Sequence, residues 1–281
     1  MIEVISSGLY TSLQDLGRFG QRKYGVPISG AMDRYSAELA NRLVGNEMHE
    51  AVIEITLSGP ILRFNSDLLV SITGADLSPL LDDKPVSMNK ALVIPKGSEL
   101  RFGPPNYGVC CYLAIAGGIK TKKVLDSYSM YAGITQKGKL EKGDTIEMQK
   151  SELSSALLHA SVRVPKEHFT SKEIELFRGP EFHMLSKNTQ KKLKTTTFTI
   201  SSESNRMAYI LNSDLNMSAP EIITAPVQPG TVQLTPSGKL MVLMRDAQTT
   251  GGYARILQLS DSAINKIAQK RPNEEVMFRF K

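Results

Sequence analysis

Three loops of the sequence hold residue types that could bind a small polar ligand. The first loop, residues 11–30, contains four glycines together with Gln14, Asp15 and Arg18. Glycine lets backbone N–H groups approach a ligand closely, and a guanidinium group favours a carboxylate or a phosphate. This composition predicts an anion-binding loop, and a hairpin with solvated ends is the alternative interpretation.

The second loop, residues 26–33, leads into a predicted helix. The free N–H groups and the positive dipole end of a helix form an anion site. Asp33 is also a favourable N-cap residue, and a capping carboxylate would occupy the same position. An anion site and a capped helix therefore both remain possible.

The third loop concentrates donors within six residues near the end of the chain. Its amide, two hydroxyls, two glycines and one aromatic ring suit a small polar substrate. A purely structural turn is the alternative. The candidate residues are Gln248, Thr249, Thr250, Gly251, Gly252 and Tyr253.

The elements that must position these loops are mostly strands, because short apolar runs alternate with Gly and Pro. Only three helices are predicted, over residues 33–44, 180–194 and 260–271. Many strands with few helices favour antiparallel sheets. The polar segment of residues 149–172 predicts a junction between domains at 1–172 and 173–281. Strands are predicted over residues 52–57, 68–73, 91–94, 109–116, 174–177, 195–200, 240–244 and 276–280.

Composition limits the classes of partner. The hydrophobic fraction of 41% is ordinary for a globular protein, and no apolar run reaches the roughly 20 residues of a membrane span. The first residues do not form a signal peptide, so we expect a cytoplasmic protein without a membrane partner. The net charge of +6 could indicate nucleic acid. However, the basic run 187–194 lies on a predicted helix without interleaved aromatic residues, so we expect no nucleic-acid partner.

Standard catalytic signatures do not occur in the sequence. It contains no phosphate-binding Gly-rich loop and no Gly-x-Ser-x-Gly elbow, and its four histidines are scattered. Cys110 and Cys111 would point to opposite faces of a strand, so we expect buried apolar side chains rather than metal ligands or a disulfide. We therefore expect no metal on this chain.

Long motifs in collinear order carry a resemblance to a known family. The chain resembles, over nearly its whole length, the KipA family, also called allophanate hydrolase subunit 2 or the biotin-dependent carboxyltransferase family. The matching stretches include Gln14-Asp15-Leu16-Gly17-Arg18, Ser29-Gly30-Ala31-Met32-Asp33, Ser204-Asn205-Arg206-Met207 and Gln248-Thr249-Thr250-Gly251-Gly252-Tyr253-Ala254-Arg255-Ile256.

The resemblance implies a mainly β fold of two cyclophilin-like β-barrel domains with a few short helices, between which strands could be exchanged. It implies a subunit of an ATP-dependent 5-oxoprolinase, a cyclic-amide hydrolase that opens 5-oxo-L-proline to L-glutamate. The partners would be a KipI-like B subunit and a LamB/YcsF-like A subunit, with ATP and Mg²⁺ used by the assembled complex. The implied catalytic residues are Asp15, Arg18 and Thr250, and the implied substrate-binding residues are Gln14, Ser29, Arg206, Gln248, Thr249, Gly251, Gly252 and Tyr253.

Two alternatives stay open within the same resemblance. The chain could be a non-catalytic regulator that binds a KipI-like kinase inhibitor, or a carboxyltransferase component acting on a urea or amide substrate. The latter would need biotin on a separate carrier, because the sequence lacks a Met-Lys-Met biotinyl segment. An enzyme site should be concave, whereas a protein interface should be flat with apolar rims. For an enzyme, we expect Arg18 and Gln248 to converge on one polar hollow.

Overall fold

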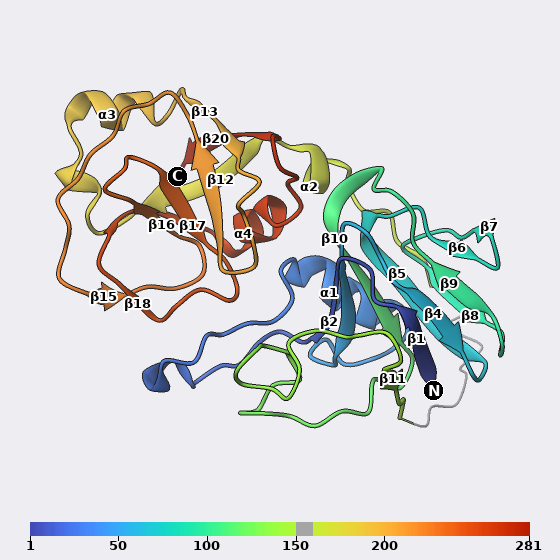
Figure 1. The fold of residues 1–281 in the computed structure, drawn as a ribbon. Helices are drawn as coiled ribbons and strands as arrows, with labels where there is room; N and C mark the ends of the chain where they lie inside the picture. Colours follow the sequence, from blue (N-terminus) through green and yellow to red (C-terminus); the bar gives the residue numbers. More distant parts are fainter. Residues whose placement is uncertain (150–159) are drawn as a thin grey trace. The chain divides into compact units, whose positions relative to one another are not determined.

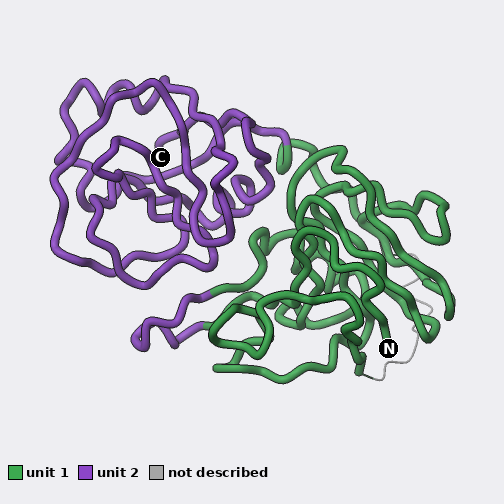
Figure 2. The backbone as a smooth tube through the Cα atoms, viewed as in Figure 1, with its two compact units in different colours: residues 1–18, 29–169 green, residues 19–28, 170–281 purple. Residues whose placement is uncertain are grey.

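The computed structural model describes residues 1–149 and 160–281, which form two compact units (Figure 2). Unit 1 comprises Met1–Arg18 and Ser29–Phe169, and unit 2 comprises Phe19–Ile28 and Thr170–Lys281. The change of unit at residue 170 lies close to the domain boundary expected after residue 172. Much of the predicted junction, residues 150–159, lies outside the described residues.

Unit 1 carries its strands in two sheets (Figure 1). The six-stranded sheet has the order β11-β1-β4-β9-β6-β7 and the five-stranded sheet the order β2-β3-β10-β5-β8. The first is built from β1 (Ile2–Ser6), β4 (Ile61–Phe64), β6 (Leu80–Leu81), β7 (Lys84–Pro85), β9 (Glu99–Arg101) and β11 (Thr145–Ile146). The second is built from β2 (Tyr10–Gln14), β3 (Val52–Thr56), β5 (Leu68–Asp76), β8 (Ala91–Ile94) and β10 (Tyr107–Ile115).

The apolar faces of both sheets contribute to one core. Ile55 and Leu113 of the five-stranded sheet and Leu62 and Phe64 of the six-stranded sheet are fully buried in it. Strand β10 is apolar along almost its whole length, which is typical of a strand buried on both faces. Each such side chain contributes roughly 1.5–3 kcal/mol by leaving water, so this core holds the sheets together.

Helix α1 (Arg34–Leu43) packs on β5 and β10 of unit 1 (Figure 1). Two hydroxyls of β5 hold the helix through its backbone carbonyls. Ser71 Oγ donates to Ala40 O at 2.6 Å, and Thr73 Oγ1 donates to Ser36 O at 2.7 Å. These bonds satisfy polar groups that would otherwise be buried without partners. The helix entry is therefore fixed against the central strands of its sheet.

Unit 2 is a closed barrel in the order β12-β19-β16-β17-β14-β13-β20, and β20 pairs parallel with β12. Closure leaves no unpaired sheet edge. Phe198 and Phe278 stack inside with ring centroids 4.7 Å apart. The barrel strands are β12 (Glu173–Arg178), β13 (Thr197–Ile200), β14 (Ala208–Asn212), β16 (Thr231–Leu234), β17 (Leu240–Leu243), β19 (Ala254–Leu259) and β20 (Glu275–Phe280). A separate ribbon pairs β15 (Ala225–Pro226) with β18 (Thr250–Gly251).

The helices match the sequence prediction in part. Helix α1 is confirmed, and α4 (Asp261–Ile267) is confirmed with a Ser260 cap but ends earlier than predicted. The long helix over 180–194 is wrong: a 3-10 turn η3 (Phe182–Met184) precedes α3 (Lys187–Lys192). Leu185 is extended and Ser186 Oγ accepts from Thr189 N, so the chain starts a new helix there. The short elements η1 (Arg22–Tyr24) and α2 (Glu167–Thr170) were not predicted.

The mainly β prediction is confirmed, and the expected barrel forms in unit 2, whereas unit 1 holds two sheets. Every strand predicted from the sequence has a counterpart among the strands above. Cys110 and Cys111 are buried and free, as predicted. Within residues 1–149 and 160–281, no helix combines the length and the apolar character that crossing a membrane requires.

Candidate functional site

Asp15 follows β2 in unit 1 and gathers four hydrogen-bond donors. Its Oδ1 accepts from Ser127 Oγ at 2.7 Å, from Ser129 Oγ at 2.6 Å and from Gly17 N at 2.8 Å, and its Oδ2 accepts from Tyr128 N at 2.7 Å. The side chain is nearly fully buried. A carboxylate that accepts this many bonds ties two distant segments together. The geometry supports a positioning role for Asp15.

Arg18 is fully buried beside the same segment. Its Nε donates to Val124 O at 3.0 Å and its Nη2 donates to Ser129 O at 2.6 Å. Charge-assisted bonds to carbonyl oxygens are strong, so Arg18 fixes the backbone of this loop. We name Asp15, Arg18, Ser127 and Ser129 the Asp15 cluster. Its serines were missed by the sequence reasoning, because Ser-x-Ser alone is a weak signal.

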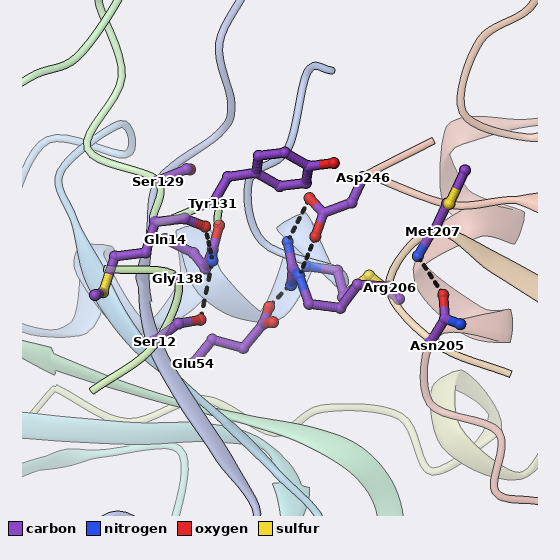
Figure 3. Close-up of polar contacts among 12 residues, drawn as sticks. Ser12, Gln14, Glu54, Ser129, Tyr131, Gly138, Asn205, Arg206, Met207 and Asp246 are labelled. Atoms are coloured by element: carbon purple, nitrogen blue, oxygen red, sulfur yellow. Dashed lines mark hydrogen bonds and ion pairs between the residues drawn. The ribbon is translucent and has the colours of Figure 1, made fainter. Parts of the chain in front are cut away.

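Gln14 lies at the end of β2, also in unit 1, and is fully buried. Its Nε2 donates to Ser12 Oγ at 2.9 Å (Figure 3). The same Nε2 donates to Met130 O at 3.2 Å. The bond to Met130 connects β2 to the loop that the Asp15 cluster holds. Of the predicted site residues, the structure thus brings Gln14, Asp15 and Arg18 together around one loop.

The entry of α1 is capped by a carboxylate. Asp33 Oδ1 accepts from Ser36 N at 3.2 Å, its Oδ2 accepts from Ser36 Oγ at 2.7 Å, and His168 Nε2 lies 2.7 Å from Oδ2. The capped-helix interpretation is therefore confirmed, and the carboxylate holds the position of the expected anion. Ser29 precedes this entry with a left-handed φ of 56°, and its side chain is fully buried.

A buried polar chain continues from Asp33 into the sheet. Asp33 N donates to Tyr112 Oη at 2.7 Å, and this hydroxyl donates to Glu54 Oε2 at 2.8 Å. Burial, reinforced by the Glu54 charge, raises the pKa of Tyr112 well above its usual value, so the phenol stays a donor. The sequence reasoning missed Glu54, Tyr112 and His168. Its one signal was a glutamate inside the apolar strand Val52–Thr56.

In unit 2, Arg206 is held by a carboxylate that was not predicted. Arg206 Nε donates to Asp246 Oδ2 at 2.7 Å and Arg206 Nη2 donates to Asp246 Oδ1 at 3.1 Å (Figure 3). The backbone supports the pair, because Asp246 N donates to Arg206 O at 3.0 Å. Both side chains are largely buried, so this is a bidentate pair with fixed geometry.

The loop that follows Asp246 is held through its backbone. Strand β18 pairs with β15, and Thr249 O accepts from Val227 N at 3.0 Å and from Arg22 Nη2 at 3.5 Å. Thr250 is exposed, and Tyr253 is 38% exposed. Backbone groups thus hold the loop in place while the Thr250 side chain stays accessible. We name residues 248–253 the glutamine loop.

Gln233 of β16 contacts the glutamine loop and is fully buried. It was not among the predicted site residues. Gln233 Nε2 donates to Tyr253 O at 3.3 Å, and Gln248 Nε2 donates to Gln233 Oε1 at 3.4 Å. Gln248 Oε1 is buried without a hydrogen-bond partner in the described part of the chain. Strand β19 begins beside this loop, and there Arg255 Nη2 donates to Glu181 Oε1 at 2.7 Å.

The predicted site residues thus form two groups. Gln14, Asp15, Arg18 and Ser29 belong to unit 1, and Arg206 with the glutamine loop belongs to unit 2. Each group is described within its own unit, and the convergence of Arg18 with Gln248 stays a prediction. Within the described ranges, no three His, Cys, Asp or Glu side chains are grouped as metal ligands.

Comparison with known proteins gives consistent matches over this chain. Residues 24–280 match the family described as "Carboxyltransferase domain, subdomain A and B". The C subunit of the Escherichia coli 5-oxoprolinase is 34% identical over 96% of this chain and 87% of its own length. The corresponding C subunit from Haemophilus influenzae is 30% identical over 99% of this chain and 90% of its own length.

A solved structure shows the same fold in a longer protein. The crystal structure of the Kluyveromyces lactis urea carboxylase matches 99% of this chain with a TM-score of 0.89 and 26% sequence identity. This chain covers only 27% of that protein. The match therefore includes both units but only one part of the longer enzyme.

Proposed function

Because the chain belongs to the carboxyltransferase domain family, subdomains A and B, we propose that it is the C subunit of an ATP-dependent 5-oxoprolinase. The observation that carries the proposal is the similarity to two 5-oxoprolinase C subunits over most of both their length and this chain's length. Proteins named as subunits act in assemblies, so this chain would work with partner chains. The proposed partners are the KipI-like and LamB/YcsF-like subunits.

The proposed reaction is the opening of a lactam that is too stable for direct hydrolysis. Transfer of the ATP γ-phosphoryl group to the lactam oxygen would make the ring carbon electrophilic. Water attack, cleavage of the ring C–N bond and loss of phosphate would then give L-glutamate, ADP and phosphate. Such chemistry depends mainly on positioning and on stabilising negative charge. ATP and Mg²⁺ belong to the assembled complex in this proposal.

Within this chain, the glutamine loop would bind the substrate. Thr249, Thr250 and the N–H groups of Gly251 and Gly252 would donate to it, and Gln248 would hold the amide. Gln14, Ser29 and Arg206 stay proposed substrate-binding residues, and Asp246 holds the Arg206 guanidinium in place. Asp15 and Arg18 would act through the loop that they order.

Reconstitution of the complex tests the proposed function. The chain would be co-expressed with a KipI-like and a LamB/YcsF-like subunit, and the formation of glutamate and ADP from 5-oxo-L-proline would be measured. We expect both products only when all three chains and ATP are present. A complete complex that forms no glutamate would refute the proposal.

Thr250→Val tests the glutamine loop within that complex. Removing the exposed hydroxyl should lower kcat/KM for 5-oxo-L-proline by about tenfold to a hundredfold, because a donor to the developing charge is lost. The melting temperature should stay unchanged, since Thr250 is exposed. Thr197→Val, an exposed threonine of β13, is the matched control and should retain full turnover. Equal turnover in the two variants would remove Thr250 from the site.

Carboxyl transfer is the second candidate, favoured by the urea carboxylase fold match. It would require a separate biotin carrier, which supplies the carboxyl group to be transferred. Replacing 5-oxo-L-proline by urea and a carrier loaded with carboxybiotin in the same reconstitution separates the two. Carboxylated urea without glutamate formation would favour this second function.

A further inference from the structure

A relay of three polar groups links the barrel wall to the glutamine loop in unit 2. Gln233 projects from β16 with no exposed surface. One end of its amide donates to Tyr253 O, and the other end accepts from Gln248 Nε2. A buried glutamine whose two ends are both engaged is held in one orientation.

The direction of this relay follows from its first member. Tyr253 O is a backbone carbonyl, which can only accept, so the group facing it must be the Gln233 NH₂. The Gln233 oxygen therefore faces Gln248, and the group that meets it must be the Gln248 NH₂. The Tyr253 carbonyl thus sets the orientation of the Gln248 amide through two successive hydrogen bonds.

In this orientation one acceptor, the Gln248 side-chain oxygen, has no donor among the described residues. This oxygen, Oε1, is buried. A buried acceptor without a donor is unfavourable, and native proteins rarely keep one without a reason. Its natural complement is a ligand that brings an N–H group.

Gly251 makes room for the relay. A Cβ atom on Gly251 would lie 2.7 Å from Gln233 Nε2, whereas one on Gly252 would lie 3.5 Å from Ile222 O, an ordinary contact. Neither glycine has a left-handed φ, so space rather than backbone conformation distinguishes the two positions. Gly251 therefore leaves the space that the Gln233 amide occupies.

We propose that Gln233 is a positioning residue that locks the Gln248 amide, so that Gln248 Oε1 accepts a hydrogen bond from an unsubstituted ring N–H of the substrate. The inference rests on the proposed function and adds the selectivity of its site. Cyclic amides that carry N–H would bind, and lactones, which present ring-oxygen lone pairs to Oε1, would be rejected. A site built for an N–H group discriminates strongly against an analogue that lacks it.

The first test measures selectivity in the assembled complex. The probe is the lactone analogue of 5-oxoproline, 5-oxotetrahydrofuran-2-carboxylate, used as a competitive inhibitor. The wild-type complex should bind this lactone at least about 100-fold more weakly than 5-oxo-L-proline. Gln233→Met removes the hydrogen bonds that hold the Gln248 amide, so this amide can rotate. The preference for 5-oxo-L-proline over the lactone should then fall by about tenfold or more.

A matched control separates selectivity from barrel stability. Gln258 of β19 also donates its amide to carbonyls, those of Pro229 and Leu259, away from the relay. Gln258→Met should lower the melting temperature while the lactam preference stays that of the wild type. An unchanged preference in a folded Gln233→Met complex would overturn the inference.

The second test needs no turnover. In the ¹⁵N-labelled full chain, the Gln248 side-chain NH₂ signals should shift toward those of a free amide in Gln233→Met. Gly251→Ala, which keeps Gln233 but displaces it, should give the same shift, and Gly252→Ala should not. Wild-type signals in both Gln233→Met and Gly251→Ala would refute the lock. A complex that makes no glutamate would refute the proposed function, and these signals would still decide the role of Gln233.

Discussion

Asp15 shows at the scale of a single residue how a buried carboxylate can order a distant loop. The sequence indicated that residues 11–30 carry polar chemistry, and the structure places Gln14, Asp15 and Arg18 around one loop. The sequence could not show the partners. Ser127 and Ser129 lie more than a hundred positions away, and only tertiary folding brings their hydroxyls to the Asp15 carboxylate.

The same limit applies in unit 2. The resemblance pointed to Arg206 and Gln248, yet Asp246 and Gln233, which hold them, carry no sequence signal of their own. Gln233 lies in the strand Thr231–Leu234, whose alternating polar and apolar residues do not indicate that Gln233 is buried. Residues that hold another side chain in place are hard to predict from the sequence, because their contacts join distant positions of the chain.

Asp15→Asn should destabilise the chain. The amide keeps one acceptor oxygen, and its NH₂ group would face either Tyr128 N at the Oδ2 position or the Ser127 and Ser129 hydroxyls at the Oδ1 position, so the cost should be roughly 2–4 kcal/mol. Chemical denaturation measures the free energy of unfolding. Asp126→Asn is the control: its side chain is exposed and its φ of 63° suits asparagine, so stability should hardly change. Equal losses in the two variants would contradict the positioning role.

At the scale of elements, local signals decided which predictions succeeded. Helix α1 was predictable because Asp33 caps its start and Gly45 follows its end. The predicted helix over 180–194 failed because periodic apolar residues masked a restart at Ser186, whose hydroxyl caps α3. A pattern of spacing alone does not show where the backbone leaves helical geometry.

The contact between η3 and β19 predicts a pH dependence. Hydrogen bonds from Arg255 lower the pKa of Glu181, so the carboxylate is stabilised in the folded state. Because the folded pKa lies below the unfolded value of about 4.3, the stabilisation is complete above that pH and is lost as the pH falls through the folded pKa. Glu181→Gln should therefore cost about 2 kcal/mol at neutral pH and progressively less below about pH 4.

Denaturation of the wild type and Glu181→Gln across this pH range measures the difference. The exposed pair of Arg279 and Glu173 is the control, since Glu173→Gln should change stability by less than about 1 kcal/mol at every pH. A difference for Glu181→Gln that stays constant down to about pH 3 would show that its charge is not what stabilises the turn.

At the scale of the whole molecule, the mainly β class was accessible from the spacing of the strands. The assignment of residues 19–28 to unit 2 was not, because it depends on contacts such as Arg22 with Thr249 across more than two hundred positions. Likewise, the strand pattern did not separate a closed barrel from two sheets, since both alternate apolar and polar residues in the same way.

Two separate cores predict two separate responses to core mutation. Ile55→Ala in β3 and Ile256→Ala in β19 each remove the same buried volume from a fully buried site, at a cost of about 2–5 kcal/mol. Hydrogen exchange measured by mass spectrometry should rise mainly in unit 1 for the first variant and mainly in unit 2 for the second. Exchange that rises equally in both units for either variant would mean that they unfold together.

Residues 19–28 belong to unit 2, although the chain before and after them belongs to unit 1. This arrangement limits how the barrel could be moved into another protein. A fragment starting at residue 170 would carry the barrel strands but not the early peptide that contacts the glutamine loop through Arg22. Any recombination that moved the barrel into another protein would have to move two separate stretches of coding sequence. The barrel is therefore expected to be engineered as two segments, residues 19–28 and 170–281, and not as one.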